Sequence, residues 1–442
     1  MLMIEFLANL TGWAVARIVI LQILVFWLLF RLIKDRQDGL VDPFSLAIFF
    51  FASGWATVFE LFLGGNCGMN FLLEFLAANS AFIFGYLLIA PKIASAQSSG
   101  VFLHNKKFPV YGLLVVFFYI ATSVVNIGAF GFGVFHENRL DIYRESGGLG
   151  VIKRFLDAYM PAAVFVLVYH RTIRGTHRKK LISAVVLGLI GVNTILDGSK
   201  SGLVSVFFAY YMSVLWFRMS GIASESFGVR RVWLWVLFAA IIAFFVLGAQ
   251  LDIADDLSRV GDVMGILFFR LFVAGDVFVL GFPYGAIDAI PLSGNPLIVL
   301  FSDFLSTLRL WSAEVVPLGT LLTIYLTPDL VELSGGPNSH VSIYSYYLFG
   351  YFGGVILAFI FGAFIGFVRA GFLKSCCNDP VAGSVMVALL LNTANMPIDP
   401  AYTMHRLTNI ALLLAPFAIL FVKLKFNRHN GVAKNSDSAG YY

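Results

Sequence analysis

The chain has 442 residues, of which 59% are hydrophobic and only 12% are charged, and its mean hydropathy is +0.87. These values exclude a soluble globular protein, in which about a quarter of the residues are charged. The net charge of +5 does not indicate a nucleic-acid binder, because the basic residues are not gathered on a solvated module. Three cysteines (Cys67, Cys376 and Cys377) fit neither a disulfide framework nor a zinc motif. Composition therefore predicts an all-α, polytopic membrane protein.

Eleven apolar segments are predicted to span the membrane, since a bilayer core requires about 20 consecutive apolar residues per helix. In chain order they are Trp13–Ile33, Pro43–Leu63, Phe71–Ala90, Val110–Gly128, Phe155–Tyr169, Leu181–Leu196, Ser201–Phe217, Val232–Ala249, Val341–Val368, Val381–Asn395 and His405–Val422. The first segment runs into Lys34-Asp35-Arg36 without a small-residue cleavage site, so we interpret it as a retained span.

The distribution of basic residues predicts the orientation of these spans. Of the 30 Lys and Arg residues, 20 cluster on one side, nine lie on the other, and Arg17 lies within the first span. The positive-inside rule assigns the clustered side to the cytoplasm, so the N-terminus is predicted outside and the C-terminus inside. Residues 1–426 are predicted to form one integral membrane domain, and residues 427–442 a disordered cytoplasmic tail.

Residues 250–340 form the one large segment predicted to lie beyond the spans on the outer side. Its apolar stretches, Val263–Phe282 and Leu297–Leu310, are joined by residues 283–296, which include Asp288 but no Lys or Arg and therefore do not resemble a cytoplasmic loop. Frequent Pro and Gly residues divide the segment into short helices. We predict interfacial or re-entrant helices that form a periplasmic cap over the mouth of the bundle.

Four apolar spans begin with basic residues on this predicted outer face: Lys153-Arg154, Lys200, His340 and His405-Arg406. A helix N-terminus already carries partial positive charge, so cations there are unfavourable unless they surround an anion. The arrangement predicts a site for a phosphate-rich ligand at the membrane surface.

The loop at residues 197–202, Asp-Gly-Ser-Lys-Ser-Gly, is the first candidate for this site. Its glycines, hydroxyl groups and Lys200 together form a cradle for an anion. The alternative is a tight loop in which Lys200 pairs with Asp197.

The basic run that contains Arg139, Arg144, Lys153 and Arg154 is the second candidate. Arginine forks suit bidentate contacts with phosphate. The alternative is anchoring at the membrane interface, with Asp157 paired to Lys153 or Arg154.

Residues 335–340, Gly-Gly-Pro-Asn-Ser-His, lead into a long apolar helix that Asn338 or Ser339 is expected to cap. The helix dipole favours neutral imidazole at His340, which is the form of a general base; an interfacial polar histidine is the alternative. Small residues recur at every fourth position of this helix and predict a ridge for close packing. The ridge consists of Gly350, Gly354, Ala358, Gly362 and Gly366.

Other ionisable residues are further candidates. Arg270 and Asp276 lie in an apolar stretch of the cap, where such residues are functional or pair with one another. Arg309 and Arg406 are weaker candidates, and Asp399 is a candidate partner that neutralises Arg406. We interpret the carboxylates between residues 252 and 262 as solvated and predict no metal site.

Several motifs, taken in order, resemble a known family. They are Gly-Leu-Gly-Val-Ile-Lys-Arg-Phe (148–155) before a span, Asp-Gly-Ser-Lys-Ser-Gly, a large outer segment, Pro-Asn-Ser-His (337–340) and a glycine-rich helix. In this plan, which covers most of the chain, the sequence resembles the Wzy-type oligosaccharide repeat-unit polymerases of O-antigen and enterobacterial common antigen. Relatives carry arginine in the Gly-x-Arg loop where this chain has Lys200.

The resemblance implies a glycosyltransferase C-like enzyme of the bacterial inner membrane, with its active site on the periplasmic side. A growing glycan on undecaprenyl diphosphate is the expected donor, and a lipid-linked repeat unit is the expected acceptor, with no metal or other cofactor. The lipid bilayer, a chain-length regulator and a flippase are the other expected partners. His340, as the base, and Arg270 are the expected catalytic residues. The residues expected to bind substrate are Arg139, Arg144, Lys153, Arg154, Lys200, Arg309 and Arg406.

Two other functions stay open at this point. An O-antigen ligase would use the same lipid donor but transfer the glycan to lipid A core. A secondary transporter would show inverted repeats with broken helices at mid-membrane, whereas no internal duplication is evident in this sequence.

Overall fold

The computed structural model describes residues 12–93, 105–133, 150–172, 176–197, 202–221, 241, 275–292, 294–311, 315–328, 336–376 and 379–422. All regular secondary structure in these ranges is helical, which confirms the predicted all-α class. The longer helices are α2 (Gly12–Ile33), α3 (Pro43–Leu63), α4 (Met69–Ile89), α5 (Phe108–Phe130), α7 (Gly150–Thr172), α8 (His177–Leu196), α9 (Gly202–Met219), α16 (Leu318–Leu326), α17 (Val341–Ser375), α18 (Pro380–Thr393) and α19 (Pro400–Asn409). The short ones are η1 (Lys34–Arg36), η2 (Gly39–Val41), α12 (Asp276–Gly281), η7 (Pro283–Gly285), α13 (Ala286–Ala289), α14 (Pro296–Leu300), α15 (Ser302–Thr307), η9 (Ile410–Leu414) and α20 (Ala415–Ile419).

The predicted spans fall on helices, except Val232–Ala249, which lies almost wholly outside the described ranges. Within the described ranges, seven helices are long and apolar enough to cross a membrane: α2, α3, α4, α5, α8, α9 and α17. By contrast, α7 carries several charged residues and α18 has only 14 residues. The protein is thus a helical membrane protein, whereas the number of eleven spans and their orientation stay predictions.

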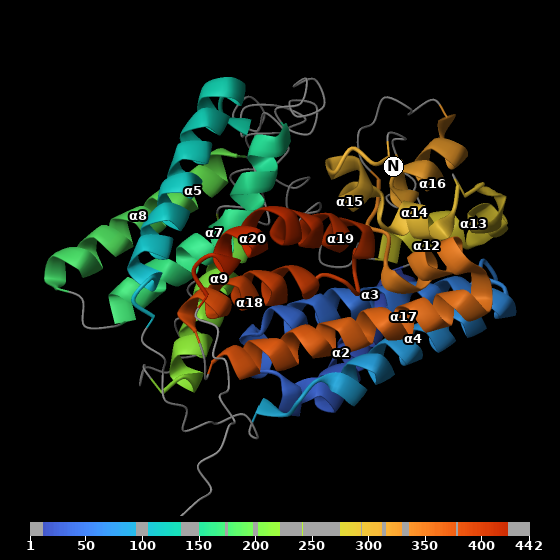
Figure 1. The fold of residues 1–442 in the computed structure, drawn as a ribbon. Coiled ribbons are helices and arrows are strands. Elements are labelled where there is room, and N and C mark those ends of the chain that lie inside the picture. The colour runs from blue at the N-terminus through green and yellow to red at the C-terminus, as the bar shows by residue number, and fades with distance from the viewer. Residues whose placement is uncertain are drawn as a thin grey trace, which may run out of the picture.

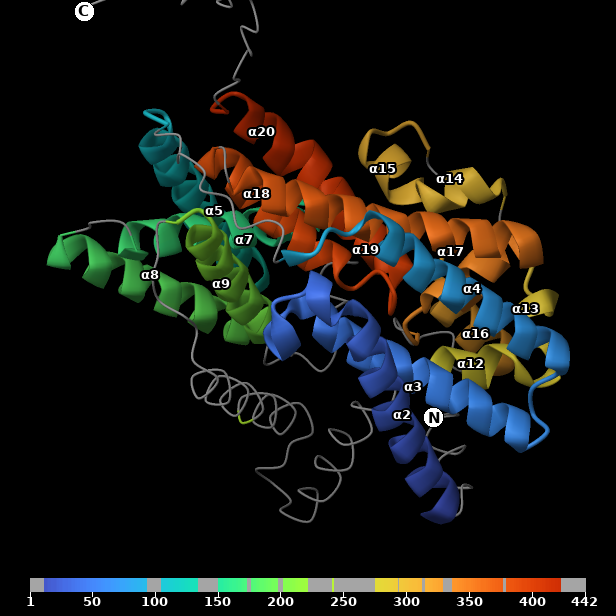
Figure 2. The same ribbon diagram turned by 90° about the horizontal axis from the view of Figure 1, so that it is seen from below.

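Figures 1 and 2 show the helices in two groups. The first group contains α2, α3, α4 and α17, the second contains α5, α7, α8 and α9, and α18 to α20 lie between them. Each group has its own apolar core, which is built around Phe51, Phe75 and Phe82 in the first and around Phe165 and Trp216 in the second. The boundary between the groups therefore lies between two separate apolar cores.

Glycines bring α4 and α17 into backbone contact. A Cβ at Gly362 would lie 1.9 Å from the carbonyl oxygen of Phe82, and one at Gly85 would lie 2.3 Å from that of Phe359. The predicted ridge is therefore confirmed at Gly362. At its other end, Gly350 has φ 64° and ψ −164°, a conformation that favours glycine, and it interrupts the helix instead of packing against a neighbour.

The described part of the predicted cap consists of the short helices α12 to α16. They are four to nine residues long, which is too short to cross a bilayer. Figure 1 shows them together near the start of α17. Phe278 of α12 is buried in the first core, and Gly275 lies so close to Thr57 of α3 that a Cβ would lie 2.2 Å from its hydroxyl oxygen. Short helices in this segment are thus confirmed, and their periplasmic location stays a prediction.

A buried polar network ties the start of α3 to other helices. Asp42 caps α3 by accepting the Phe44 N–H at 3.0 Å, and its Oδ1 lies 3.2 Å from Nη1 of Arg369 on α17. The Arg369 and Asp42 side chains are only 2% and 0% exposed. Just before α3, Asp38 pairs with Arg218 of α9 at 2.8 Å. The network joins helices of both groups.

The last predicted span is not a uniform helix. A π turn, η9, follows α19, and α20 continues the chain beyond it. Such turns are rare and often lie at functional sites. Here the turn separates α19, whose residues line the two cavities described below, from α20, whose Ala418 is buried in the second core.

Candidate functional site

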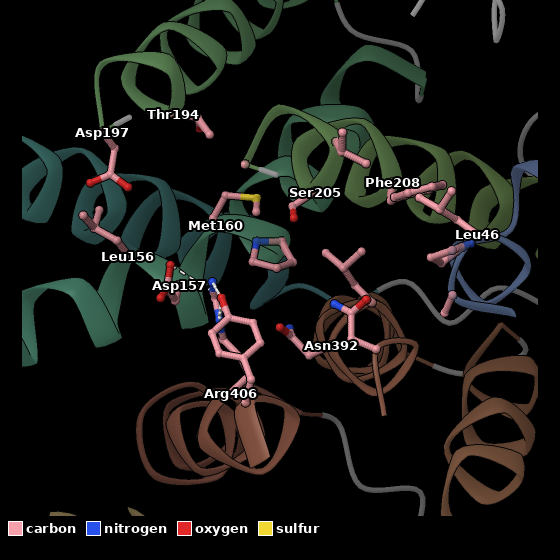
Figure 3. A pocket seen from close by; sticks show the side chains of 18 of the residues that line it. Leu46, Leu156, Asp157, Met160, Thr194, Asp197, Ser205, Phe208, Asn392 and Arg406 are labelled. Atoms are coloured by element: carbon pink, nitrogen blue, oxygen red, sulfur yellow. Dashed lines mark hydrogen bonds and ion pairs between the residues drawn. The ribbon is translucent and has the colours of Figure 1, made fainter. Parts of the chain in front are cut away.

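A cavity of about 320 Å³ lies where the two groups of helices meet, and we name it the Lys153 cavity. Its walls come from α3 of the first group, from all four helices of the second, and from α18 and α19 between them (Figure 3). Its size lies within the range of small-molecule pockets, about 300–1,000 Å³.

Four charged side chains meet in the wall of this cavity. Lys153 of α7 lies 2.6 Å from Asp197, the residue that ends α8, and 3.5 Å from Asp157 one turn along α7. Nη1 of Arg406, on α19, lies 2.9 Å from Oδ1 of Asp157 (Figure 3). Three separate elements thus converge through two cations and two carboxylates.

These contacts decide between alternatives that the sequence left open. The pairing of Lys153 with Asp157 is confirmed, and Lys153 also binds the carboxylate of Asp197. The pairing of Arg406 with Asp399 was wrong, because Asp399 instead caps α19 by accepting the Tyr402 N–H at 3.1 Å. Each described cation in the cavity wall therefore has a carboxylate partner, so the described part of the site is balanced in charge and not a ring of bare cations.

Tyr402 orients Arg406. The two residues are four apart on α19 and therefore share one helix face. The Tyr402 hydroxyl accepts from Nε of Arg406 at 2.8 Å, and the guanidinium carbon lies 4.9 Å from the ring centroid, a cation–π distance. Sequence reasoning missed Tyr402, although the Tyr-x-x-x-Arg spacing on a polar helix was a usable signal.

The rest of the cavity wall is mostly apolar. Leu46 and Phe50 of α3, Met160 of α7 and Phe208 of α9 all line it. Polar residues in this part of the wall include Asn392 of α18, Asn193 and Ser205 (Figure 3). The cavity is therefore amphipathic, with charges on α7, α8 and α19 and hydrocarbon along α3 and α9. Sequence reasoning also missed Asn392, which is a polar residue inside a predicted span and thus a functional candidate by default.

Arg154 and Arg309 lie away from the Lys153 cavity, on or beside the short helix α15. Nη1 of Arg154 donates to the hydroxyl of Thr307 on that helix, so Arg154 links α7 to the cap segment. Arg309 is exposed just after α15, with φ 57°. Neither residue lines the Lys153 cavity, whereas Lys153 and Arg406 do.

The remaining predicted cations, Arg139, Arg144, Lys200 and Arg270, lie outside the ranges that the structure describes. The described residues that precede Arg139, Arg144 and Lys200 in the sequence are nevertheless in contact with one another. Gly133, six residues before Arg139, packs on the backbone of Asp197, where a Cβ would lie 2.7 Å from the carbonyl oxygen. The two basic loops thus depart from neighbouring points at the charged side of the cavity.

His340 is completely enclosed by aromatic rings of the first group. It is 0% exposed, its ring stacks on Phe51 with centroids 5.1 Å apart, and Phe278 contacts it edge-on at 4.7 Å. Burial lowers the pKa of the imidazole and keeps it neutral, so its neutral form is explained by desolvation. In this conformation the ring does not line the Lys153 cavity, so the packing does not support a role as the base there.

His340 also caps α17 itself. Its Nδ1 accepts the N–H of Ser342 at 3.4 Å, so the prediction that Asn338 or Ser339 caps this helix was wrong. Instead, the Ser339 hydroxyl donates to Asp399 at 3.2 Å. The sequence could not show this, because the exchange depends on a partner 60 residues away along the chain.

Among the residues that the structure describes, no three or more His, Cys, Asp or Glu side chains are placed to hold a metal ion. No family model, curated protein or solved structure matches this chain. The site therefore has to be interpreted from its own chemistry.

Proposed function

We propose that the protein is a membrane glycosyltransferase that polymerises lipid-linked oligosaccharide repeat units, with the Lys153 cavity as the site of the lipid diphosphate. The observation that carries the proposal is the amphipathic wall of this cavity. Lys153 and Arg406 offer charge to a head group, while Phe50, Met160 and Phe208 offer an apolar surface to a hydrocarbon chain. A polyprenyl diphosphate has both properties in one molecule.

The paired cations suit a ligand that comes and goes. The side chains of Lys153 and Arg406 are 28% and 20% exposed, so a ligand can reach them. Their carboxylate partners hold them in place when no anion is bound. A diphosphate that enters the cavity takes the place of a carboxylate as the partner of each cation. The Arg406 fork is suited to bidentate phosphate contacts, and Lys153 supplies a compact charge.

The proposed reaction transfers the growing glycan from its diphosphate to a hydroxyl group of the next repeat unit. Breaking the bond between the anomeric carbon and oxygen leaves both bonding electrons on the diphosphate. Cations fixed beside this group stabilise the charge that develops in the transition state. Arg406 is held by Asp157 and Tyr402, so little reorganisation is needed at that moment.

The proposal rests further on the predicted topology and on the resemblance to Wzy-type polymerases. In that topology the first turns of α7 and the end of α8 lie on the periplasmic side of the inner membrane, where lipid-linked repeat units are joined. The basic loops that carry Arg139, Arg144 and Lys200 depart from the same place and are the expected source of further positive charge.

The test is polymer formation in proteoliposomes that contain lipid-linked repeat units isolated from the producing cell. We expect Lys153→Ala and Arg406→Ala each to lower the rate about 100-fold, the typical effect of removing one group that stabilises the leaving anion. Arg218→Ala is the matched control, since Arg218 pairs with Asp38 at a similar distance but does not line the cavity. Equal loss in all three variants contradicts the proposal.

The same assay separates the other functions. A ligase forms product only when lipid A core is supplied as the acceptor. A transporter moves a solute without any covalent product. If wild-type protein does not extend the glycan when lipid-linked repeat units are the sole substrate, the polymerase proposal is overturned.

A further inference from the structure

A second cavity, of about 370 Å³, lies on the other side of α19 beneath the short helices α14, α15 and α16. We name it the Asp399 cavity. It is lined by residues from four parts of the chain, including Asp303, Asn338, Tyr344, Tyr347, Asp399 and His405. Tyr402 is the residue that lines both cavities.

The chemistry of this second cavity differs from that of the first. The described residues that line it include carboxylates, an amide, an imidazole and tyrosine hydroxyls, but no Lys or Arg. Such a wall does not suit a phosphate. It suits a neutral ligand with many hydroxyl groups, because carboxylate and amide oxygens accept hydrogen bonds from them and aromatic rings pack against the C–H faces. An oligosaccharide is a ligand of this kind.

The arrangement around α19 connects the two cavities. Arg406 lines the Lys153 cavity, Asp399 and His405 line the second one, and Tyr402 between them lines both. A sugar attached to a diphosphate beside Arg406 would therefore meet a second sugar, held in the other cavity, close to Tyr402. Asp399 lines the second cavity and lies three residues before Tyr402 in the sequence.

We propose that the Asp399 cavity binds the acceptor saccharide and that Asp399 takes the proton from its attacking hydroxyl. This inference rests on the proposed function. The acceptor oxygen forms a bond to the anomeric carbon of the donor, the bond from that carbon to the diphosphate oxygen breaks, and the diphosphate leaves with the electron pair. The hydroxyl proton moves to the Asp399 carboxylate, so the step is balanced without another reactant.

Asp399 is held firmly for this task. Its Oδ1 accepts from the Ser339 hydroxyl at 3.2 Å and from the Tyr402 N–H at 3.1 Å, while Oδ2 takes part in neither bond. The preceding residues are tied down as well, since the N–H of His340 donates to the carbonyl of Ile398 at 2.9 Å. The backbone at the start of α17 thus anchors the segment that carries Asp399, and this anchor does not depend on the imidazole of His340.

Burial raises the pKa of Asp399 to about 6. The titratable groups that face it are Tyr344 of α17 and Asp276 of α12, and the paired Asp303 and His405 line the same cavity. A base works when it is deprotonated, so the rate should fall as the pH drops through about 6. A carboxyl group in this range is well matched to proton transfer near neutral pH.

Asp399→Asn tests the assignment. Asparagine caps helices as well as aspartate does and keeps an oxygen for Ser339 and Tyr402, so α19 stays folded. We expect polymer formation to fall about 100-fold or more, the usual contribution of a general base. Thermal unfolding and the binding of farnesyl diphosphate, a probe of the Lys153 cavity, should be unchanged. Asp288→Asn is the control, since Asp288 bonds to Tyr346 at 2.8 Å and does not line the cavity.

The pH profile separates a base from a structural residue. Wild-type activity should show an acid limb near pH 6, and the residual activity of Asp399→Asn should lack it. A variant that is as active as wild type, or that keeps the acid limb, overturns the role of Asp399 while the proposed function stands.

The saccharide site has its own test, which does not require catalysis. The oligosaccharide released from its lipid should show saturation-transfer NMR signals with wild-type protein, and Thr320→Phe, which fills the cavity, should abolish them. If wild-type protein binds this oligosaccharide but forms no polymer, the proposed function fails and the saccharide site stands. Absence of binding to wild type, or equal binding to Thr320→Phe, overturns the site.

Discussion

Two arginine–aspartate pairs of this protein have similar chemistry and different surroundings. Arg369 and Asp42 join α17 to the start of α3 and are 2% and 0% exposed. Arg406 and Asp157 join α19 to α7 and are 20% and 15% exposed in the wall of a cavity. The first pair is sealed, whereas the second is accessible from the cavity.

The difference shows why an ion pair within a membrane bundle is not by itself a functional site. Asp42 is also a helix cap and Arg369 lies among packed side chains, so both groups are fully committed to the fold. Among the described residues, Arg406 contacts Asp157 and Tyr402, which lie beside open volume. Access to a cavity, more than charge, distinguishes the binding candidates from the structural ones.

Breaking the sealed pair should have the largest effect on stability. Arg369→Ala leaves the Asp42 carboxylate buried without its partner, which is expected to cost about 3–5 kcal/mol of unfolding free energy. Arg218→Ala, at a partly exposed pair, should cost about 1 kcal/mol or less. Thermal unfolding in detergent measures both. If the two variants unfold at the same temperature, burial does not distinguish these pairs.

Freeing the cations of the accessible pair should strengthen ligand binding. Asp157→Asn removes the carboxylate that neutralises Arg406 and one partner of Lys153. We expect farnesyl diphosphate to bind about tenfold more tightly, a gain of about 1.4 kcal/mol, measured by titration calorimetry. Asp38→Asn, which frees Arg218 instead, serves as the control and should leave the affinity unchanged. Unchanged affinity in Asp157→Asn would show that no anion competes for these cations.

The smallest effect is expected at His340, which belongs to the sealed class although it begins the helix beside the Asp399 cavity. His340→Phe preserves an aromatic ring among Phe51, Phe75 and Phe278 and loses the cap on Ser342, for about 1 kcal/mol of stability. Polymer formation should persist near the wild-type rate. A loss of about 100-fold without unfolding would instead restore His340 as the catalytic base.

The helices of this fold were predictable because hydropathy and length decide which segments cross a bilayer. The close contact of α4 and α17 was predictable for the same kind of reason, since a row of small residues is a local pattern. The break at Gly350 was not, because Gly350 and Gly362 are the same residue type and only their neighbours in space give them different roles.

The site was predictable only in part. Basic residues at helix starts drew attention to Lys153 and Arg406, which do line a cavity. Their carboxylate partners could not be assigned, because Lys153 and Asp197 are 44 residues apart and meet through the packing of α7 on α8. The burial of His340 depends likewise on Phe51 and Phe278, which come from distant segments, so the local motif suggested a reactive group where the fold places an enclosed one.

The wide turn at Ile410–Leu414 has a consequence for how this architecture tolerates change. One residue added to an α-helix rotates the residues beyond it by about 100°, which within α19 would turn Arg406 away from the Lys153 cavity. A π turn absorbs such an addition locally. Insertions and deletions toward α20 can therefore be accommodated at this turn, while the residues of α19 keep their places in the Lys153 cavity and the Asp399 cavity.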